Sequence, residues 1–507
     1  MPVMTHDISA TLIRGARVLT LDSQNTEFSS ADILLSNGVI AAVGPSLSAP
    51  EGCKVIEAAG MLAMPGLINA HFHSPGNLMR GQLDCLPLEI FMLREVPPLA
   101  NEANSERLIK IRTLLGAAEM LRGGITCVMD DAYHVPIASI AAIDSICNAY
   151  SEIGIRARVA IDQPNIVEYD KYPFLKDLLT PALRAQLESS PRQTGDELIE
   201  LYRYLITQYG TDQGLIQPAI SCSAPHRVTP DYLKALNQLS QEYALPFNMH
   251  ILETKLQRVY GTERLGKSLV AYADDHGILH EHSVVIHAIW VDQADINRLA
   301  KHNVMIAHNP ICNLKLGSGI APFREWRDAG LRVCLGSDEA NTDDRINMWD
   351  IMKTAGMVHT LRSPDWHTWP TAEEILEIAI RGGADALGWK NRIGSLQPGY
   401  QADLILLDLD RYAFTPLNDL IRQLIYAESG SSVVHVFVAG NQVVDNGKIT
   451  GKITTIDEKA LRSEARALLA ETTHMADDSI NRLEPYYRQM VLRAHEEAVF
   501  NNRRLEQ

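Results

Sequence analysis

Residues 64–73 read Met64-Pro65-Gly66-Leu67-Ile68-Asn69-Ala70-His71-Phe72-His73, a short apolar run that ends in two histidines one residue apart. Pro65 and Gly66 bound the run, which is typical of a buried strand. Side chains on a strand alternate between its faces, so His71 and His73 point the same way and can bind one metal ion. Neutral imidazole suits Zn, Fe, Ni or Cu better than Mg or Ca. In a chain with 17 histidines such a pair also arises by chance, so its interpretation depends on the rest of the sequence.

Size and composition indicate a globular protein with more than one domain. A chain of 507 residues exceeds what one hydrophobic core usually supports. The formal net charge of −16 argues against a nucleic-acid partner, which needs a clustered basic surface. The seven cysteines are scattered without a C-x-x-C pair, which indicates a reducing compartment rather than a disulfide framework. We see no signal peptide and no run of the ~18 apolar residues that a membrane span needs, so we expect a cytoplasmic protein with no membrane partner.

Eight apolar segments with helical patterns between them predict the central domain, residues 62–390. The segments are residues 62–69, 125–130, 155–162, 215–222, 246–251, 283–288, 303–308 and 331–338. Eight strands that alternate with helices are what a (β/α)8 barrel requires, so the predicted fold class is α/β with a TIM barrel. An open doubly wound sheet is the alternative, but no G-x-G-x-x-G follows any early strand.

The two ends of the chain carry β patterns that predict a second, smaller domain. Residues 1–61 and 391–454 contain these patterns, with a hairpin signal at Ser36-Asn37-Gly38. Because chain ends commonly lie close together, the two parts can close into one small domain with the barrel inserted between them.

Residues 455–507 form a predicted C-terminal helical extension. A proline cannot continue a helix, so we expect Pro485 to separate two helices there. The second helix carries an apolar stripe. This stripe packs either on its own barrel or on a second subunit of a homo-oligomer, a dimer or a tetramer.

Five side chains that can bind a metal fall at the ends of the apolar segments. They are His71, His73, His250, His287 and Asp338. The active site of a TIM barrel lies at the carboxyl ends of its strands, so we expect these five to converge on one mouth. Three imidazoles and a carboxylate can hold one divalent ion and leave a position for water, as catalytic metal sites do.

The same positions supply the groups that a hydrolytic reaction needs. A divalent ion lowers the pKa of its bound water toward ~7 and so supplies hydroxide at neutral pH. Asp338 can accept the proton of that water, and His287 can hydrogen-bond the hydroxide. Glu253 lies three residues past His250, where its carboxyl can protonate a ring nitrogen or a departing amine; a solvated loop glutamate is the other interpretation. We therefore expect Glu253, His287 and Asp338 to be catalytic.

These motifs together resemble the amidohydrolase superfamily. The resemblance is carried by residues 64–73, His250 with Glu253, His287, residues 308–319 and Leu335-Gly336-Ser337-Asp338. More narrowly, the chain resembles the branch that holds triazine hydrolases, S-adenosylhomocysteine and methylthioadenosine deaminases, and guanine and cytosine deaminases. The resemblance extends to about residue 450 and implies a barrel flanked by a β-sandwich that is built from both chain ends.

The resemblance also implies a metal and its ligands. It implies one Zn²⁺, or sometimes Fe²⁺, on His71, His73, His250 and Asp338, with His287 orienting the hydrolytic water and Glu253 transferring protons. The fourth segment does not end in lysine, where relatives with two metal ions carry a carboxylated one. We therefore expect a single ion.

The sequence departs from nucleoside deaminases on the fourth segment. Ser223-Ala224-Pro225-His226 stands where those enzymes carry His-Ala-Pro-Tyr. Gln163, His226 and His308, which end the third, fourth and seventh segments, then become the candidates for substrate contacts.

The leading functional hypothesis is a metal-dependent hydrolytic deaminase of a nitrogen heterocycle, such as a triazine, purine, pterin or pyrimidine. A second hypothesis keeps the site but changes the bond, so that chloride or an alkylamine is displaced or a cyclic amide is opened. A third is a non-catalytic barrel protein, which the occupation of all five metal-competent positions argues against.

Overall fold

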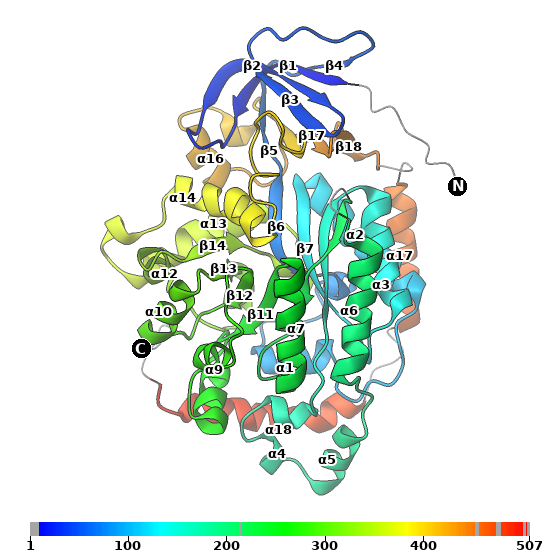
Figure 1. Ribbon diagram of the computed structural model, residues 1–507, viewed down its shortest axis with the longest axis vertical. Helices are drawn as coiled ribbons and strands as arrows, with labels where there is room; N and C mark the ends of the chain where they lie inside the picture. The colour runs from blue at the N-terminus through cyan, green and yellow to red at the C-terminus, as the bar shows by residue number, and fades with distance from the viewer. Residues whose placement is uncertain (1–9, 212–213, 452–455, 473–477, 500–502, 504–507) are drawn as a thin grey trace.

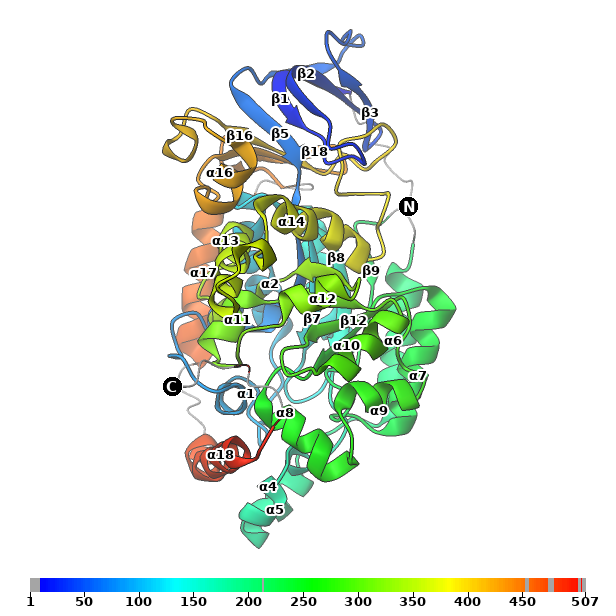
Figure 2. The same ribbon diagram turned by 90° about the vertical axis from the view of Figure 1, so that its left-hand side faces the viewer.

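The computed structural model describes residues 10–211, 214–451, 456–472, 478–499 and residue 503. A small β-sheet forms one end of the molecule and an α/β body forms its middle (Figure 1). The C-terminal helix α18, Asp478–Glu496, lies at the opposite end beside α4 and α5, as the rotated view also shows (Figure 2).

Parallel strands form the centre of the body in two five-stranded sheets, ordered β15-β6-β7-β8-β9 and β10-β11-β12-β13-β14. Their bounds are β6 Leu67–His73, β7 Ile125–Tyr133, β8 Arg156–Asp162, β9 Ile216–Pro218, β10 Ile220–Ser221, β11 Phe247–Ile251, β12 Ser283–His287, β13 Met305–His308, β14 Arg332–Leu335 and β15 Asp338–Glu339. Only Ala219 separates β9 from β10, and two residues separate β14 from β15, so each pair corresponds to one of the eight predicted segments. In the eighth segment, β14 pairs with β13 and β15 pairs with β6. The strand order therefore closes on itself, as in a (β/α)8 barrel.

Helices surround the strands of the body (Figure 1). Their bounds are α1 Leu88–Glu95, α2 Glu106–Arg122, α3 Ile140–Ile153, α4 Leu175–Leu178, α5 Pro181–Glu188, α6 Gly195–Tyr209, α7 Pro230–Tyr243, α8 Lys255–Tyr260, α9 Leu269–Asp275, α10 Gln293–Lys301, α11 Pro310–Lys315, α12 Phe323–Asp328, α13 Met348–Val358, α14 Ala372–Glu377, α15 Gly383–Ala386, α16 Leu420–Tyr426 and α17 Glu458–Thr472. Helix α6 illustrates why they form: Thr194 and Glu197 make a capping box, which satisfies backbone N–H groups at the helix start. Leu198, Tyr202 and Leu205 then recur at helical spacing and are buried against the strands.

One nine-stranded sheet combines strands from both ends of the chain. Its strands are β1 Thr11–Leu19, β2 Glu27–Ser36, β3 Val39–Gly44, β4 Lys54–Glu57, β5 Met61–Pro65, β16 Leu404–Asp408, β17 Val433–Val438, β18 Asn441–Asp445 and β19 Lys448–Ile449. β16 pairs with β5 in antiparallel register, which joins the two parts as the sequence predicted. The predicted hairpin at Ser36-Asn37-Gly38 is also confirmed, because Asn37 and Gly38 have the positive φ angles of 51° and 79° that its tight turn requires. Strand pairing defines one sheet, so the two-layered sandwich stays a prediction.

The first predicted barrel segment, residues 62–69, is two strands in two different sheets. It divides at Gly66, whose N–H donates to the carbonyl of Asp403. A Cβ at this position would lie 2.1 Å from Oγ1 of Thr126. Only glycine fits where the chain passes from β5 into β6, and the apolar pattern alone did not reveal this change of sheet.

The predicted break at Pro485 is wrong, because Pro485 lies inside α18. A proline removes the hydrogen bond to the carbonyl four residues earlier, here that of Asn481. Both residues are exposed, so water can satisfy this carbonyl. The helix is held instead by its opposite face, where Tyr487 and Met490 are fully buried in a cluster with residues of α1, α4 and α8. The apolar stripe thus packs on its own chain.

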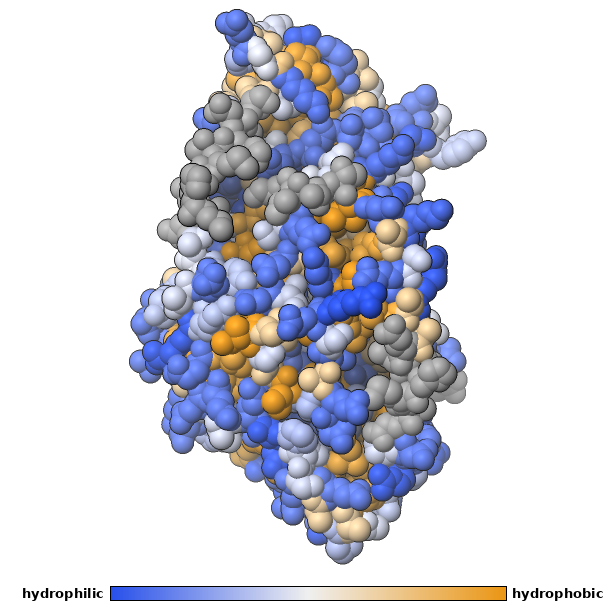
Figure 3. Space-filling view, turned by 90° about the vertical axis from the view of Figure 1, so that its right-hand side faces the viewer, coloured by the Kyte–Doolittle hydropathy of each residue, from blue (hydrophilic) through white to orange (hydrophobic). Residues whose placement is uncertain are grey.

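The other C-terminal helix, α17, lies along α2. Ion pairs join the two helices between Arg107 and Glu464 (2.7 Å) and between Arg122 and Glu458 (2.9 Å). On the face of the molecule where α2 and α17 lie, most of the surface is hydrophilic and hydrophobic residues form separate patches (Figure 3). Within the described ranges, no helix has the length and hydropathy that crossing a membrane requires.

Candidate metal centre and active site

The pairing of β6 with β15 brings two histidines and an aspartate together. Asp338 is paired with Phe72, which places it beside both His71 and His73 along β6. Its Oδ1 atom is 3.7 Å from Nε2 of His71 and 3.5 Å from Nε2 of His73. Ligand atoms that share one ion at ~2.1 Å lie roughly 3 to 4 Å apart, so these distances are those of a metal site.

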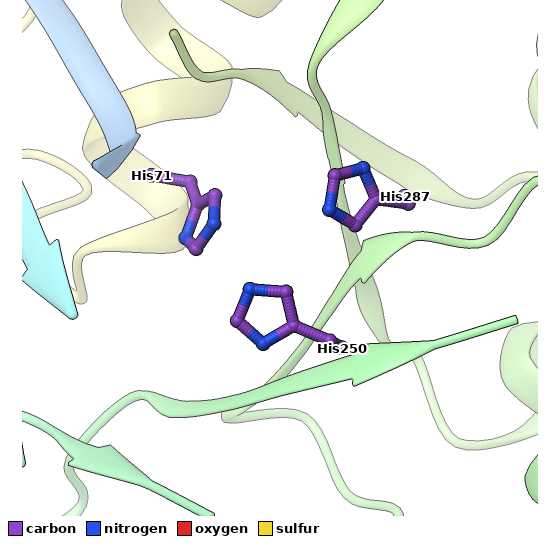
Figure 4. Close-up of side chains that lie close together, drawn as sticks. All are labelled: His71, His250 and His287. Atoms are coloured by element: carbon purple, nitrogen blue, oxygen red, sulfur yellow. The ribbon is translucent and has the colours of Figure 1, made fainter. Parts of the chain in front are cut away.

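Two further strands add a histidine each. His250 lies on β11, and its ring centroid is 5.0 Å from that of His71 and 5.3 Å from that of His73. His287 ends β12, with Nε2 3.5 Å from Oδ2 of Asp338. Figure 4 shows the rings of His71, His250 and His287 entering one space from three different strands. The predicted convergence of the five metal-competent side chains is therefore present in the structure.

Hydrogen bonds orient three of the four imidazoles. Nδ1 of His73 lies 2.5 Å from the carbonyl of Asp131, and Nδ1 of His250 lies 2.8 Å from the carbonyl of Ser223. Nδ1 of His287 lies 2.8 Å from Oδ1 of Asn313. A carbonyl or amide oxygen only accepts, so each Nδ1 donates and each Nε2 is left for the shared space.

His71 provides a test of whether these residues suit a metal. Its side chain is fully buried, yet within the described residues neither ring nitrogen has a hydrogen-bond partner. Burial, together with the charges of the neighbouring histidines, lowers the pKa of His71 well below its usual range, so the ring is neutral. A buried neutral imidazole beside a carboxylate is the ligand form that a divalent ion requires, and the residues therefore fit a metal.

The surroundings of His73 favour a cation. Burial lowers its pKa, but the carboxylates of Asp338, Asp131 and Asp162 outweigh this effect and raise the pKa to about 9. A position that attracts a proton so strongly attracts a divalent ion as well.

Glu253 has the acidity of a proton-transfer group. Burial raises its pKa to about 7, with His287 opposing the shift and Asp338 adding to it. Its Oε2 atom is 3.6 Å from Nε2 of His287, and Ser318 donates a 3.4 Å hydrogen bond to its Oε1. A carboxyl with a pKa near neutrality can both accept and release a proton during one reaction cycle.

The backbone at the strand ends is strained. Asp338 and His287 have φ angles of 61° and 69°, a region that side chains other than glycine rarely adopt. Asn69 holds this arrangement by donating to Oγ of Ser337 (2.7 Å) and accepting from its N–H (2.9 Å). Such strain is common where a structure aims side chains at a site.

The histidines open into a cavity of about 750 Å3, counting its opening to solvent. His73, His250, His287, Asp338 and Glu253 line it. Asp162, Lys171, Arg227 and Glu339 also line it, and sequence analysis did not select them. Asp162 ends the third segment, so its position at a strand end was a signal that could have found it. Lys171 ends a short 3-10 helix and Arg227 lies in a turn, and no periodic pattern marks either position.

The three predicted substrate contacts lie elsewhere. Gln163 lines a neighbouring cavity. His226 packs on Tyr260, with ring centroids 4.8 Å apart, and Nε2 of His308 lies 3.0 Å from Nε2 of His359. Of the described residues that line the main cavity, none is His226 or His308. Their role as substrate contacts stays a prediction.

A family model and several relatives match this chain over most of its length. The model of the amidohydrolase family matches residues 62–443. The chain belongs to the amidohydrolase family. It is therefore a hydrolase of carbon–nitrogen bonds other than peptide bonds, as the sequence indicated.

Two curated relatives of this amidohydrolase are deaminases. The 5'-deoxyadenosine deaminase of Methanopyrus kandleri is 32% identical over 390 residues, which cover 76% of this chain and 82% of that protein. The 5-methylthioadenosine/S-adenosylhomocysteine deaminase of Natronomonas pharaonis is 31% identical over 475 residues, which cover 93% of this chain and all of that protein.

Two solved structures are similar to this chain over most of its length. Atrazine chlorohydrolase from Arthrobacter aurescens, complexed with zinc, has a TM-score of 0.82 and 27% identity, covering 90% of this chain and 99% of its own. An adenosine deaminase from Xanthomonas campestris with bound zinc has a TM-score of 0.78 and 28% identity, covering 91% of this chain and 98% of its own. This likeness implies the TIM-barrel fold that the strand order indicates.

Proposed function

We propose that this amidohydrolase is a metal-dependent hydrolytic deaminase of a nitrogen heterocycle of triazine, purine, pterin or pyrimidine type. The observation that carries the proposal is the position of His287, whose Nε2 lies 3.5 Å from Asp338 and 3.6 Å from Glu253 at the mouth that His73 and His250 also line. One imidazole between two carboxyl groups provides the proton-transfer path that the addition of water and the loss of an amine require.

In this proposal His71, His73, His250 and Asp338 hold one divalent ion, Zn²⁺ first and Fe²⁺ as the alternative. The fit of His71 and the two zinc-bound solved neighbours support this ligand set. When bound, such an ion lowers the pKa of a coordinated water toward ~7 and so provides hydroxide at neutral pH.

Three side chains of the protein would orient the water and transfer the protons. Asp338 takes the proton of the attacking water at its Oδ2 atom. Nε2 of His287 accepts a hydrogen bond from that water and so orients it for attack. Glu253 starts protonated and delivers its proton to the ring nitrogen, for which its pKa of about 7 suits it. The proton that Asp338 took from the water then passes by way of His287 and Glu253 to the departing amine, and the proton of the new hydroxyl group returns to Glu253.

Ammonia release tests this function directly. Purified protein should release ammonia from at least one member of a panel of amino-triazines, purines, pterins and pyrimidines. Chelation should abolish the activity, and Zn²⁺ or Fe²⁺ should restore it. Protein that carries metal but releases no amine from any member would contradict the proposal and favour a non-catalytic barrel.

A second candidate function is the displacement of chloride or an alkylamine, or the opening of a cyclic amide, at the same site. The structural likeness to an atrazine chlorohydrolase favours it. Chloride, alkylamine and ammonia should therefore be measured on each triazine of the panel. Chloride release without ammonia would favour this second function.

We also infer the domain organisation, cellular location and oligomeric state of the protein. Residues 1–61 and 391–454 would form a β-sandwich, residues 62–390 the catalytic barrel and residues 455–507 a helical extension, in a cytoplasmic homo-oligomer, a dimer or a tetramer. Its seven unpaired cysteines suit a reducing compartment. Met357 and Leu361 on neighbouring segments are more than half exposed, which suits self-association. Light scattering of the purified protein tests the oligomeric state.

A further inference from the structure

A large cavity lies at the opposite end of the barrel from the histidines. It encloses about 1190 Å3, counting its opening to solvent. Met305 and Arg332, which begin β13 and β14, line it, whereas the metal-competent side chains lie near the carboxyl ends of the barrel strands. Of the described residues, none lines both this cavity and the one at the histidines. The cavity is therefore separate from the candidate active site.

The cavity lies where the barrel meets the small sheet. Leu21 and Ser23, in the turn that follows β1, form part of its wall, and so do residues of the segment 390–400 that leads into β16. The two segments are joined where Oγ of Ser395 donates to the carbonyl of Thr20 (3.1 Å). Helix α14, which also borders the cavity, lies at the end of the body nearest the small sheet (Figures 1 and 2). A ligand in this cavity would contact both parts of the molecule.

The charged residues that line this cavity are mostly cations. They are Arg327, Arg332, Arg381, Lys390, Glu377 and Asp385. Two carboxylates cannot neutralise four cations, so the lining carries two surplus positive charges. The protein as a whole has a formal net charge of −16, so this surplus is local. A concave surface with one sign of charge concentrates ions of the opposite sign.

Glu377 is shared between two arginines. Its carboxylate oxygens lie 3.6 Å from Nη2 of Arg327 and 3.9 Å from Nη2 of Arg381. Both distances exceed ~3.2 Å, the usual limit of an N–H···O hydrogen bond, so the carboxylate engages neither guanidinium group closely. Arg381 also donates through Nη1 to the carbonyl of Asp22 (3.2 Å), which fixes its orientation. A stronger acceptor in the cavity can therefore bind both guanidinium groups.

Asp385 is shared between an arginine and a lysine. Its carboxylate oxygens lie 3.2 Å from Nη1 of Arg332 and 3.9 Å from Nζ of Lys390. Arg332 is held in place, because its Nε atom donates to the carbonyl of Asn303 (3.1 Å). The side chain of Lys390 is mostly exposed and only loosely paired, so it can turn toward a ligand.

The arginines carry their charge in a partly buried position. The side chains of Arg327, Arg332 and Arg381 are 24%, 23% and 37% exposed. Removing a charge from water is costly unless a counter-charge compensates it, and the two carboxylates compensate only half of the four positive charges. A planar guanidinium group forms paired hydrogen bonds with phosphate. An anion of the phosphate type therefore suits both the charge and the donors of this cavity.

We propose that this cavity binds a phosphate-bearing small molecule at a site distinct from the metal centre. A phosphate dianion matches the two surplus charges, and Arg327, Arg381 and Lys390 would hold it. Because segments of the barrel and of the small sheet both form the wall, the bound ligand would also stabilise the folded protein. This site goes beyond the proposed deaminase function and does not depend on it.

Calorimetry on the zinc-loaded protein tests this site. Pyrophosphate is the probe, and citrate, which carries its charge on carboxylates, is the comparison at the same ionic strength. Pyrophosphate should bind with saturation, more tightly than citrate, and should raise the temperature of thermal unfolding. Protein from which chelation has removed the zinc should bind pyrophosphate with the same affinity. The proposal is overturned if binding does not saturate, if citrate binds as tightly as pyrophosphate, or if binding is lost with the metal.

Four variants locate the probe. Arg327→Gln and Lys390→Gln each remove one positive charge and should each weaken pyrophosphate binding by about three- to tenfold, the value of one partly exposed hydrogen bond. Glu377→Gln removes a competing carboxylate and should strengthen binding, a gain that a misfolded protein cannot show. Arg203→Gln on α6 is the matched control, because Arg203 is exposed and lies 3.7 Å from Glu200, a pair as loose as that of Arg327. Binding as tight in Arg327→Gln and Lys390→Gln as in Arg203→Gln, or weaker in Glu377→Gln, would also overturn the proposal.

Discussion

Glu253 controls the pH dependence of the proposed reaction. Its pKa of about 7 results from burial, which His287 opposes and Asp338 reinforces. The protonated form delivers the first proton to the ring nitrogen, so the contribution of Glu253 to kcat/KM should be constant below about pH 7 and fall as the pH rises through about 7. Glu253→Gln should lower kcat by about 10²- to 10⁴-fold and remove this fall. Metal content measured alongside should stay unchanged; its loss would assign Glu253 to the metal instead.

Asn313 selects the tautomer of His287. Its Oδ1 accepts from Nδ1, which leaves the lone pair of Nε2 for the proton-transfer path. Asn313→Ala should lower kcat by about 10- to 100-fold with little change in KM or metal content, because it frees the ring to rotate and to change tautomer. Leu314→Ala is the matched control, since Leu314 follows on the same helix and is half exposed. An unchanged kcat for Asn313→Ala would show that the orientation comes from packing alone.

At the level of single residues, the sequence predicted the metal-competent side chains better than it predicted the substrate contacts. His71 and His73 share a face whatever the register of their strand, because they are two residues apart. The choice between Asp162 and Gln163 depended on which of two consecutive residues faces the main cavity, and a shift of one residue reverses that choice. Asp162 lines both the main cavity and its neighbour, whereas Gln163 lines only the neighbouring one of these two. Contacts such as the one between His308 and His359 join segments 51 residues apart, which no local pattern indicates.

The junction between β14 and β15 positions a ligand-bearing strand. A Cβ on Gly336 would lie 2.7 Å from Cβ of His71 and 2.8 Å from its carbonyl oxygen. Gly336→Ala should therefore push β6 and β15 apart, lower the metal content of the purified protein and reduce its free energy of unfolding by about 1–3 kcal/mol. Metal analysis and denaturant unfolding measure the two effects. Gly44→Ala should change neither, because a Cβ at Gly44 would have no atom of the described residues within 4 Å apart from its chain neighbours.

Strand and helix patterns located most of the elements, and they failed where tertiary contacts override local preference. The eight apolar segments are present, but the first also supplies a strand to the other sheet through β5. Pro485 lacks a backbone N–H and therefore predicts a helix end. Helix α18 continues through Pro485 because the buried face of the helix packs on the barrel. A sequence pattern shows which secondary structure a segment prefers locally. It does not show the tertiary contacts that can outweigh this preference.

At the scale of the whole molecule, α18 ties the end of the chain to the substrate cavity. It contacts α1, α4 and α8, three segments that follow different barrel strands. Tyr487 donates a 2.7 Å hydrogen bond to Glu168, and Glu168 forms an ion pair with Lys171. Glu168 and Lys171 both line the main cavity. The C-terminal extension therefore supports the wall of the site, although it lies beyond residues 62–443, which the family model matches.

Two substitutions in α18 should separate its structural role from its effect on the cavity. Met490→Ala removes a fully buried side chain and should lower the free energy of unfolding by about 2–5 kcal/mol, whereas Gln489→Ala on the exposed face should change it by less than about 0.5 kcal/mol. Tyr487→Phe keeps the packing and removes one hydrogen bond, so it should cost only about 1 kcal/mol but raise KM more than it lowers kcat, because Glu168 and Lys171 lose their support. Thermal unfolding and steady-state kinetics on the same preparations measure both effects. A Tyr487→Phe enzyme with unchanged KM would mean that the helix stabilises the barrel without shaping the site.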